Sequence, residues 1–284
     1  MEILEKLENL LSNEEKSIAL VAPSFVADFK YPDFIYQLRH LGFDQVVELT
    51  FGAKLVNIAY YKILKENRNK TWISSPCPTV VMLVKKQFPE LIPNLMPVHS
   101  PMGMMSQICH KYFPNHKQVF IGPCITKKNE AEEIGGIELV LTFKETKKYI
   151  DDKEPQTTPI GEHPFDKFYN DYTKIYPLSG GLSQTLKYNH ILEEKDILIT
   201  EGMKELLEIF SQFKNGRYKN YIFLDVLSCP GGCIGGPAMA VEDNIENRKN
   251  KIIAYRDWAA KNEHNLGRTG KKTHAKGIKT ERVF

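Results

Sequence analysis

Four of the five cysteines in this 284-residue chain lie in three short loops that contain proline. Cys77 stands in Ser-Pro-Cys-Pro, Cys124 in Gly-Pro-Cys-Ile, and Cys229 and Cys233 in Ser-Cys-Pro-Gly-Gly-Cys. Thiolates act as metal ligands and nucleophiles, and a rigid proline beside a cysteine holds the sulfur in place before a metal arrives. Because disulfides are rare in a reducing cytoplasm, these loops predict metal binding or redox chemistry.

The chemistry that suits four thiolates is a [4Fe–4S] cube, with one sulfur on each iron. Gly231 and Gly232 lie between Cys229 and Cys233, and glycine lets the backbone approach a cluster and aim its N–H groups at sulfide. Two other interpretations stay open. The cysteines can be small buried hydrophobes, or they can form a zinc site, although zinc sites usually have a close pair on each side. Cys109 lies in an apolar helical stretch and is predicted to be a core residue.

The elements that must position these loops are short apolar segments, which predict buried strands. Thr71–Ser74, Gln118–Gly122 and Tyr221–Leu227 each precede a cysteine loop. Parallel sheets place their sites beyond the carboxyl ends of their strands, so loops far apart in sequence can meet. Further strands are predicted at Ser17–Ala22, Val46–Leu49 and Ile137–Phe143.

Helical patterns alternate with these strands and predict an α/β fold with mostly parallel sheets. The predicted helices are Phe51–Glu66, Thr79–Phe88, Met102–Phe113 and Thr200–Phe213, the last with Thr200 as its N-cap. A polar excursion is expected over Asp151–Asp171, which contains three prolines.

Charge and hydropathy exclude some classes of protein. The net charge is only +3, but residues 261–284 contain seven Lys or Arg and two Glu. A basic tail can bind nucleic acid or an anionic membrane, or it can be a solvated, frayed terminus; nothing else in the chain suggests nucleic-acid binding. No apolar run of about 18 residues is present, and the N-terminus lacks the features of a secretory signal. We therefore expect a cytoplasmic protein with no membrane span.

Several segments, in their order along the chain, resemble the catalytic domain of iron-only ([FeFe]) hydrogenases. They are Ala22-Pro23-Ser24, Phe51-Gly52-Ala53, Ser74–Pro78, Phe88–Leu91 with Ser100-Pro101, Pro123–Lys128 with Glu130-Ala131, Ser179–Gly181, and Cys229–Cys233 with Gly235-Gly236. The resemblance runs from about Ile18 to Ala240. It implies two lobes, each a mostly parallel sheet flanked by helices, with the iron–sulfur site in the cleft between them. Residues 1–258 would form this domain, followed by a flexible basic tail at 259–284.

The resemblance also implies cofactors. In that family the matching cysteines hold a [4Fe–4S] cube, and the last, here Cys233, also bridges to a diiron unit with CO, cyanide and dithiolate ligands. Together these form the H-cluster. Lys127 would then bond to one cyanide, while Ser24 and the backbone of Ala22 and Pro23 would serve the other. A lysine after a strand is otherwise usually solvated, so that interpretation of Lys127 stays open.

The implied reaction interconverts protons, electrons and H2. Its partners would be an external electron carrier such as ferredoxin and a diiron maturation protein. The chain has no Cys-x2-Cys-x2-Cys run for additional clusters, so an outside donor would deliver electrons directly to the cube.

The chain departs from the family where protons are relayed to the diiron unit. Active members have a cysteine at the position of Pro76, and they have acidic residues where this chain has Lys54–Tyr60. A relay needs ionisable or hydroxyl groups within hydrogen-bond reach, so its loss should slow turnover by a factor of about 10² or more. Three functions therefore remain open: a slow hydrogenase, an H2- or redox-sensing module, and a [4Fe–4S]-only relative similar to the family's iron–sulfur assembly homologues.

Overall fold

Two parallel sheets form the framework of the chain in a computed structural model, which describes residues 2–13, 15–153, 164–169, 172–187, 191–213, 215–263 and 269–284. The strands are β1 (Ser17–Val21), β2 (Gln45–Glu48), β3 (Trp72–Ile73), β4 (Lys117–Gly122), β5 (Leu139–Thr142), β6 (Ile197–Glu201) and β7 (Phe223–Leu227). One sheet has the order β2-β1-β4-β5 and the other β3-β7-β6, and all pairings within both are parallel. The predicted α/β fold with mostly parallel sheets is confirmed.

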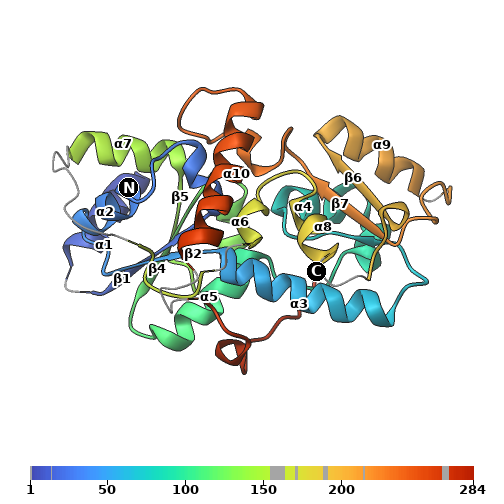
Figure 1. Cartoon of the computed structure of the whole chain (residues 1–284), viewed down its shortest axis with the longest axis horizontal. Coiled ribbons are helices and arrows are strands. Elements are labelled where there is room, and N and C mark those ends of the chain that lie inside the picture. The colour runs from blue at the N-terminus through green and yellow to red at the C-terminus, as the bar shows by residue number, and fades with distance from the viewer. Residues whose placement is uncertain are drawn as a thin grey trace.

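Helices connect these strands and cover them. Their bounds are α1 (Ile3–Ser12), α2 (Asp33–His40), α3 (Thr50–Glu66), α4 (Pro78–Gln87), α5 (Pro101–Tyr112), α6 (Lys127–Ile134), α7 (Phe143–Lys153), α8 (Gly181–Lys187), α9 (Met203–Phe213) and α10 (Ile245–Asn262). Figure 1 shows the two sheets side by side along the long axis of the molecule, with α10 across the middle. All five residues of β1 are buried, as its mostly apolar sequence Ser-Ile-Ala-Leu-Val predicts.

Most predicted strands and helices agree with the structure to within two residues. The prediction at Thr200 was wrong, because this residue belongs to strand β6 and not to a helix cap. Helix α9 begins only at Met203, after Gly202, whose φ of +96° favours glycine. Cys109 is fully buried in α5, as predicted. The expected excursion between Asp151 and Asp171 lies mostly outside the described residues.

The segment expected to form a flexible tail, residues 259–284, contains helix and paired backbone in the described part of the chain. Helix α10 continues to Asn262. Among the described residues beyond it, Glu281 forms an antiparallel bridge with Val98, and the Arg282 side chain is buried. The reason is electrostatic, because the Arg282 guanidinium forms an ion pair with the buried carboxylate of Glu130. In the described part of the chain, no helix combines the length and apolar character that a membrane crossing requires.

Candidate iron–sulfur site

The three cysteine loops meet at one cavity, which Cys77, Cys124, Cys229 and Cys233 line together. Cys77 follows β3 and occupies the N-cap position of helix α4. Cys124 follows β4, and Cys229 and Cys233 follow β7. Since β4 belongs to one sheet and β3 and β7 to the other, the cavity lies at the carboxyl ends of strands from both sheets. This is the place where parallel α/β sheets bind their ligands.

The sulfur atoms lie close enough to influence one another. The Ser228 hydroxyl is 3.4 Å from Cys77 Sγ and 3.8 Å from Cys229 Sγ. Burial raises the pKa of the Cys233 thiol, and the negative charges of the other three cysteines raise it further. Burial likewise raises the pKa of Cys124 and Cys229, so these three free thiols are hard to ionise, whereas bound iron would displace their protons and neutralise the accumulated charge.

Four cysteine side chains at one cavity are the donors that a cube requires. Among the residues that the structure describes, no three His, Cys, Asp or Glu side chains are placed to hold one metal ion. A tetrahedral zinc site requires such a group. A cube spreads four thiolates over four irons, so its ligands stand farther apart. The arrangement is therefore compatible with a [4Fe–4S] cluster.

The backbone N–H groups of the two glycines between Cys229 and Cys233 bond to protein oxygens. The Gly231 N–H donates to Glu201 Oε1 at 2.8 Å, and the Gly232 N–H donates to the Cys229 carbonyl at 3.0 Å. That these groups can point at sulfide stays a prediction. Their role is steric, because Gly232 has φ +87° and a Cβ there would lie 2.3 Å from the Pro177 carbonyl oxygen.

Ser24 contributes an unsatisfied hydroxyl to the cavity. Ala22, Pro23 and Ser24 all line it, at the turn that follows β1. The Ser24 side chain is 1% exposed, and its Oγ has no hydrogen-bond partner among the described residues. An unpaired buried polar group costs about 1–3 kcal/mol, so a ligand that accepts or donates a hydrogen bond here would relieve that cost.

Lys127 also lines the cavity, and its ammonium is held firmly at the wall. Its Nζ donates to Glu130 Oε2 at 2.5 Å, to Ser100 Oγ at 3.2 Å and to the Pro76 carbonyl at 3.3 Å. The side chain is 12% exposed, so the solvated interpretation of this lysine is wrong. Ser100 itself is fixed as the N-cap of α5, where it accepts the Gly103 N–H.

A buried carboxyl group that sequence reasoning missed also lines the cavity. Asp225 Oδ2 accepts hydrogen bonds from Ser183 N at 2.9 Å and Ser183 Oγ at 2.7 Å. Burial raises the pKa of Asp225, and these two hydrogen bonds offset only part of that effect. The available signal was a charged residue inside the apolar strand Tyr221–Leu227.

Comparison with known proteins places these observations in a family. The family model described as "Iron only hydrogenase large subunit, C-terminal domain" matches residues 15–237. Iron hydrogenase 1 of Clostridium pasteurianum is 24% identical over 296 residues, which cover 82% of this chain and 52% of that protein. The cytosolic Fe-S cluster assembly factor NAR1 of Yarrowia lipolytica is 22% identical over 325 residues, which cover 84% of this chain and 64% of that protein. The chain thus spans about half to two thirds of the length of these relatives.

Solved structures show the same fold. The [FeFe]-hydrogenase HydA(deltaEFG) superimposes with a TM-score of 0.73 at 15% identity, covering 100% of this chain and 99% of that one. A variant of HydA1 from Chlamydomonas reinhardtii gives 0.72 at 15% identity with the same coverage. Because the family match includes all four cavity cysteines and more than half of the chain, this chain belongs to the family formed by the C-terminal domains of iron-only hydrogenases.

Proposed function

We propose that this chain is an [FeFe]-hydrogenase-like protein whose Cys77, Cys124, Cys229 and Cys233 hold a [4Fe–4S] cube. The observation that carries the proposal is the meeting of all four cysteines, from three distant loops, at one cavity. Family membership and the hydrogenase fold support it. An external electron carrier such as ferredoxin would deliver electrons to the cube.

The cavity wall also suits a diiron unit with cyanide ligands. Cyanide is an anionic hydrogen-bond acceptor, and a buried ammonium forms a strong, charge-assisted contact with such a group. Lys127 supplies the ammonium, and its longest contact, to the Pro76 carbonyl, is the one that a ligand would replace. Ser24 supplies a hydroxyl that has no partner in the described chain. The diiron unit, when bound, would supply the metal at which protons, electrons and H2 interconvert.

Proton transfer to a bound diiron unit should be slow in this chain. Pro76 lines the cavity and has no group that can carry a proton. The surrounding wall includes Leu49, Met102 and Phe120, which exclude water. We therefore propose a hydrogenase with slow turnover. Cysteine at this position would restore an ionisable group, and Pro76→Cys should then accelerate H2 production if proton transfer limits the rate.

A second candidate is a [4Fe–4S]-only protein of the assembly-factor type. The similarity to NAR1 favours it, as does Pro76 at the relay position. Lys127 is consistent with it too, because Glu130 and Ser100 already accept two of its three N–H groups. In this case the diiron unit would never be loaded.

One experiment separates these functions. The cube is reconstituted anaerobically, a synthetic diiron cofactor is added, and infrared spectra are recorded together with an H2 assay. CO and cyanide bands with H2 production support the slow enzyme. Bands without turnover support a sensing role, and a loaded cube without any bands supports the [4Fe–4S]-only protein.

A further inference from the structure

The last residues of the chain lie beside the segment that leads into helix α5. The His99 N–H donates to the Thr280 carbonyl at 3.0 Å, and the Arg282 N–H donates to the Pro97 carbonyl at 3.1 Å. Between these bonds, Val98 and Glu281 form an antiparallel bridge. This pairing brings the C-terminal residues next to Ser100, whose hydroxyl accepts from Lys127.

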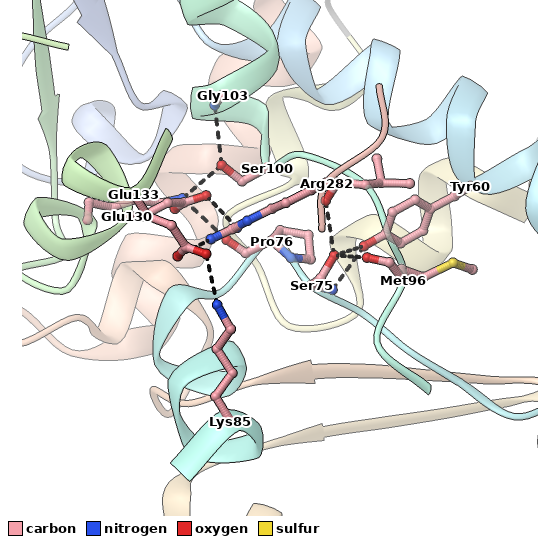
Figure 2. A network of polar contacts seen from close by, with 12 residues as sticks. Tyr60, Ser75, Pro76, Lys85, Met96, Ser100, Gly103, Glu130, Glu133 and Arg282 are labelled. Atoms are coloured by element: carbon pink, nitrogen blue, oxygen red, sulfur yellow. Dashed lines mark hydrogen bonds and ion pairs between the residues drawn. The ribbon is translucent and has the colours of Figure 1, made fainter. Parts of the chain in front are cut away.

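The Arg282 side chain turns from this segment into the interior, where it contacts two carboxylates (Figure 2). Its Nη1 lies 3.0 Å from Glu130 Oε1, and its Nη2 lies 2.8 Å from Glu133 Oε2. Arg282 is 4% exposed and Glu130 only 1%, whereas Glu133 is 40% exposed. The first of these ion pairs is therefore buried, and the second reaches the surface.

The buried carboxylate is shared between two cations. Glu130 Oε1 faces Arg282, while its Oε2 accepts from the Lys127 ammonium at the cavity wall. A guanidinium is a planar fork with fixed donor directions, so it sets the orientation of the carboxylate that it binds. Because Arg282 fixes Oε1 of Glu130, the position of Oε2 is fixed as well. The Lys127 ammonium that binds Oε2 is therefore held in one place.

We propose that Arg282 is a positioning residue, which acts through Glu130 to hold the Lys127 ammonium at the edge of the cavity. Only the ligand of this ammonium depends on the proposed function. That ligand would be an anionic diatomic group, such as cyanide on a diiron unit. Arg282 lies outside residues 15–237, the part of the chain that the family model matches. The contact is therefore a property of this chain that the family match does not supply.

Three variants test the proposal in the chain with its reconstituted cube. Arg282→Met removes the guanidinium and therefore both of its ion pairs, with Glu130 and with Glu133. Arg282→Lys keeps a positive charge beside Glu130. Glu133→Gln is the matched control, because it removes the partly exposed carboxylate that pairs with Arg282 and Lys85 and leaves the buried pair of Arg282 and Glu130. The readout is the rate at which an acylating reagent modifies the Lys127 amine, followed by mass spectrometry. Lys144, which donates to the Pro237 carbonyl at 2.9 Å, is the internal reference.

The expected result is selective release of Lys127. In Arg282→Met its rate should rise at least about tenfold, because Glu130 loses the guanidinium that fixes its orientation and can turn away from the cavity wall together with the Lys127 ammonium. Arg282→Lys should restore most of the wild-type protection, and Glu133→Gln should match the wild type. Lys144 should not change in any variant. An Arg282→Met chain with full cube content and wild-type protection of Lys127 would overturn the proposal.

The remaining outcomes are also decisive. If Arg282→Met does not fold, Arg282→Gln takes its place, because it also removes the positive charge beside Glu130 and leaves a polar side chain there. Wild-type protection of Lys127 in a folded Arg282→Gln chain would then refute the role of Arg282. Adding the synthetic diiron cofactor gives a second readout, because Arg282→Met should show weaker cyanide bands per cube than Glu133→Gln. If even the wild type takes up no diiron unit, the proposed hydrogenase function fails, while the acylation rates still decide whether Arg282 positions Lys127.

Discussion

At the scale of single residues, the cavity wall is mostly apolar, and its few polar side chains therefore determine what it can bind. Lys127, Ser24 and Asp225 differ in charge and in how their hydrogen bonds are satisfied. In a site of low effective dielectric constant, each such group interacts more strongly with a ligand than it would in water. Changes to single side chains should consequently separate loading of the cube from loading of a diiron unit.

Lys127→Ala should leave the cube intact but block diiron uptake, because the variant keeps all four cysteines and loses the ammonium. The measurement is iron content followed by the cyanide bands in the infrared. Lys128→Ala is the matched control, since Lys128 pairs with Glu145 and does not line the cavity. Normal diiron uptake by Lys127→Ala would refute the assigned role.

Glu201→Gln should raise the reduction potential of the cube. Glu201 accepts the Gly231 N–H inside the loop between Cys229 and Cys233, so its negative charge stands next to a ligand loop. Glutamine can keep that hydrogen bond while removing the charge, which favours the more negative, reduced cluster by an amount on the order of tens of millivolts. A redox titration followed by electron paramagnetic resonance measures the shift. Glu208→Gln, at an exposed position of α9, should leave the potential unchanged.

At the scale of elements, the turn that follows β7 depends on backbone that only glycine adopts easily. Gly232→Ala should sharply reduce both the melting temperature and the bound iron, because the new Cβ would meet the Pro177 carbonyl. Gly277→Ala is the matched control, since Gly277 has a similar φ of +85° with open space around its missing Cβ. The control should cost only about 1–2 kcal/mol, the strain of a left-handed conformation. Equal losses in both variants would show that the close approach to Pro177 is unimportant.

The elements also show how far sequence reasoning reaches. Strands β1, β4 and β7 were predictable because buried parallel strands are continuous apolar runs, and loops after such strands belong at one edge of a sheet. Strand β6 was missed because only its first three residues are apolar and a strong helix pattern follows directly after Gly202. The pairing of Arg282 with Glu130 has no local signal, since it joins residues 152 positions apart.

At the scale of the whole molecule, the cavity joins the two sheets. Its cysteines come from both, so a cube bound to all four would link the sheets and stabilise the folded chain. Buried polar contacts also join separate elements without iron. One is the pair formed by Asp225 on β7 and Ser183 on α8, which also brings a carboxyl group into the interior.

Asp225→Asn should change how stability depends on pH. Burial raises the pKa of Asp225, so the folded chain holds this proton more tightly than the unfolded chain does. The stabilisation from the protonated form is full below about pH 4 and is lost as the pH rises through the higher folded value. The wild type should therefore lose stability relative to Asp225→Asn as the pH rises from about 4 to 7. Burial, and to a smaller extent the charge of Asp225, raises the pKa of Tyr60 and Tyr176, which titrate well above this range.

Denaturant unfolding at several pH values measures this difference. Asparagine keeps an oxygen that can accept both Ser183 hydrogen bonds, so the variant should differ mainly in charge. Stability curves that run parallel for the two chains over this range would contradict the expected behaviour of Asp225.

The most direct test of the account is the iron and sulfide content of the anaerobically reconstituted chain, with Mössbauer and electron paramagnetic resonance spectra. We predict about four iron and four sulfide ions per chain and the spectra of one [4Fe–4S] cluster, with iron content sharply reduced in Cys124→Ser. A chain that binds a single zinc ion, or that keeps its full iron content in Cys124→Ser, would contradict the claim that the four cysteines hold one cube.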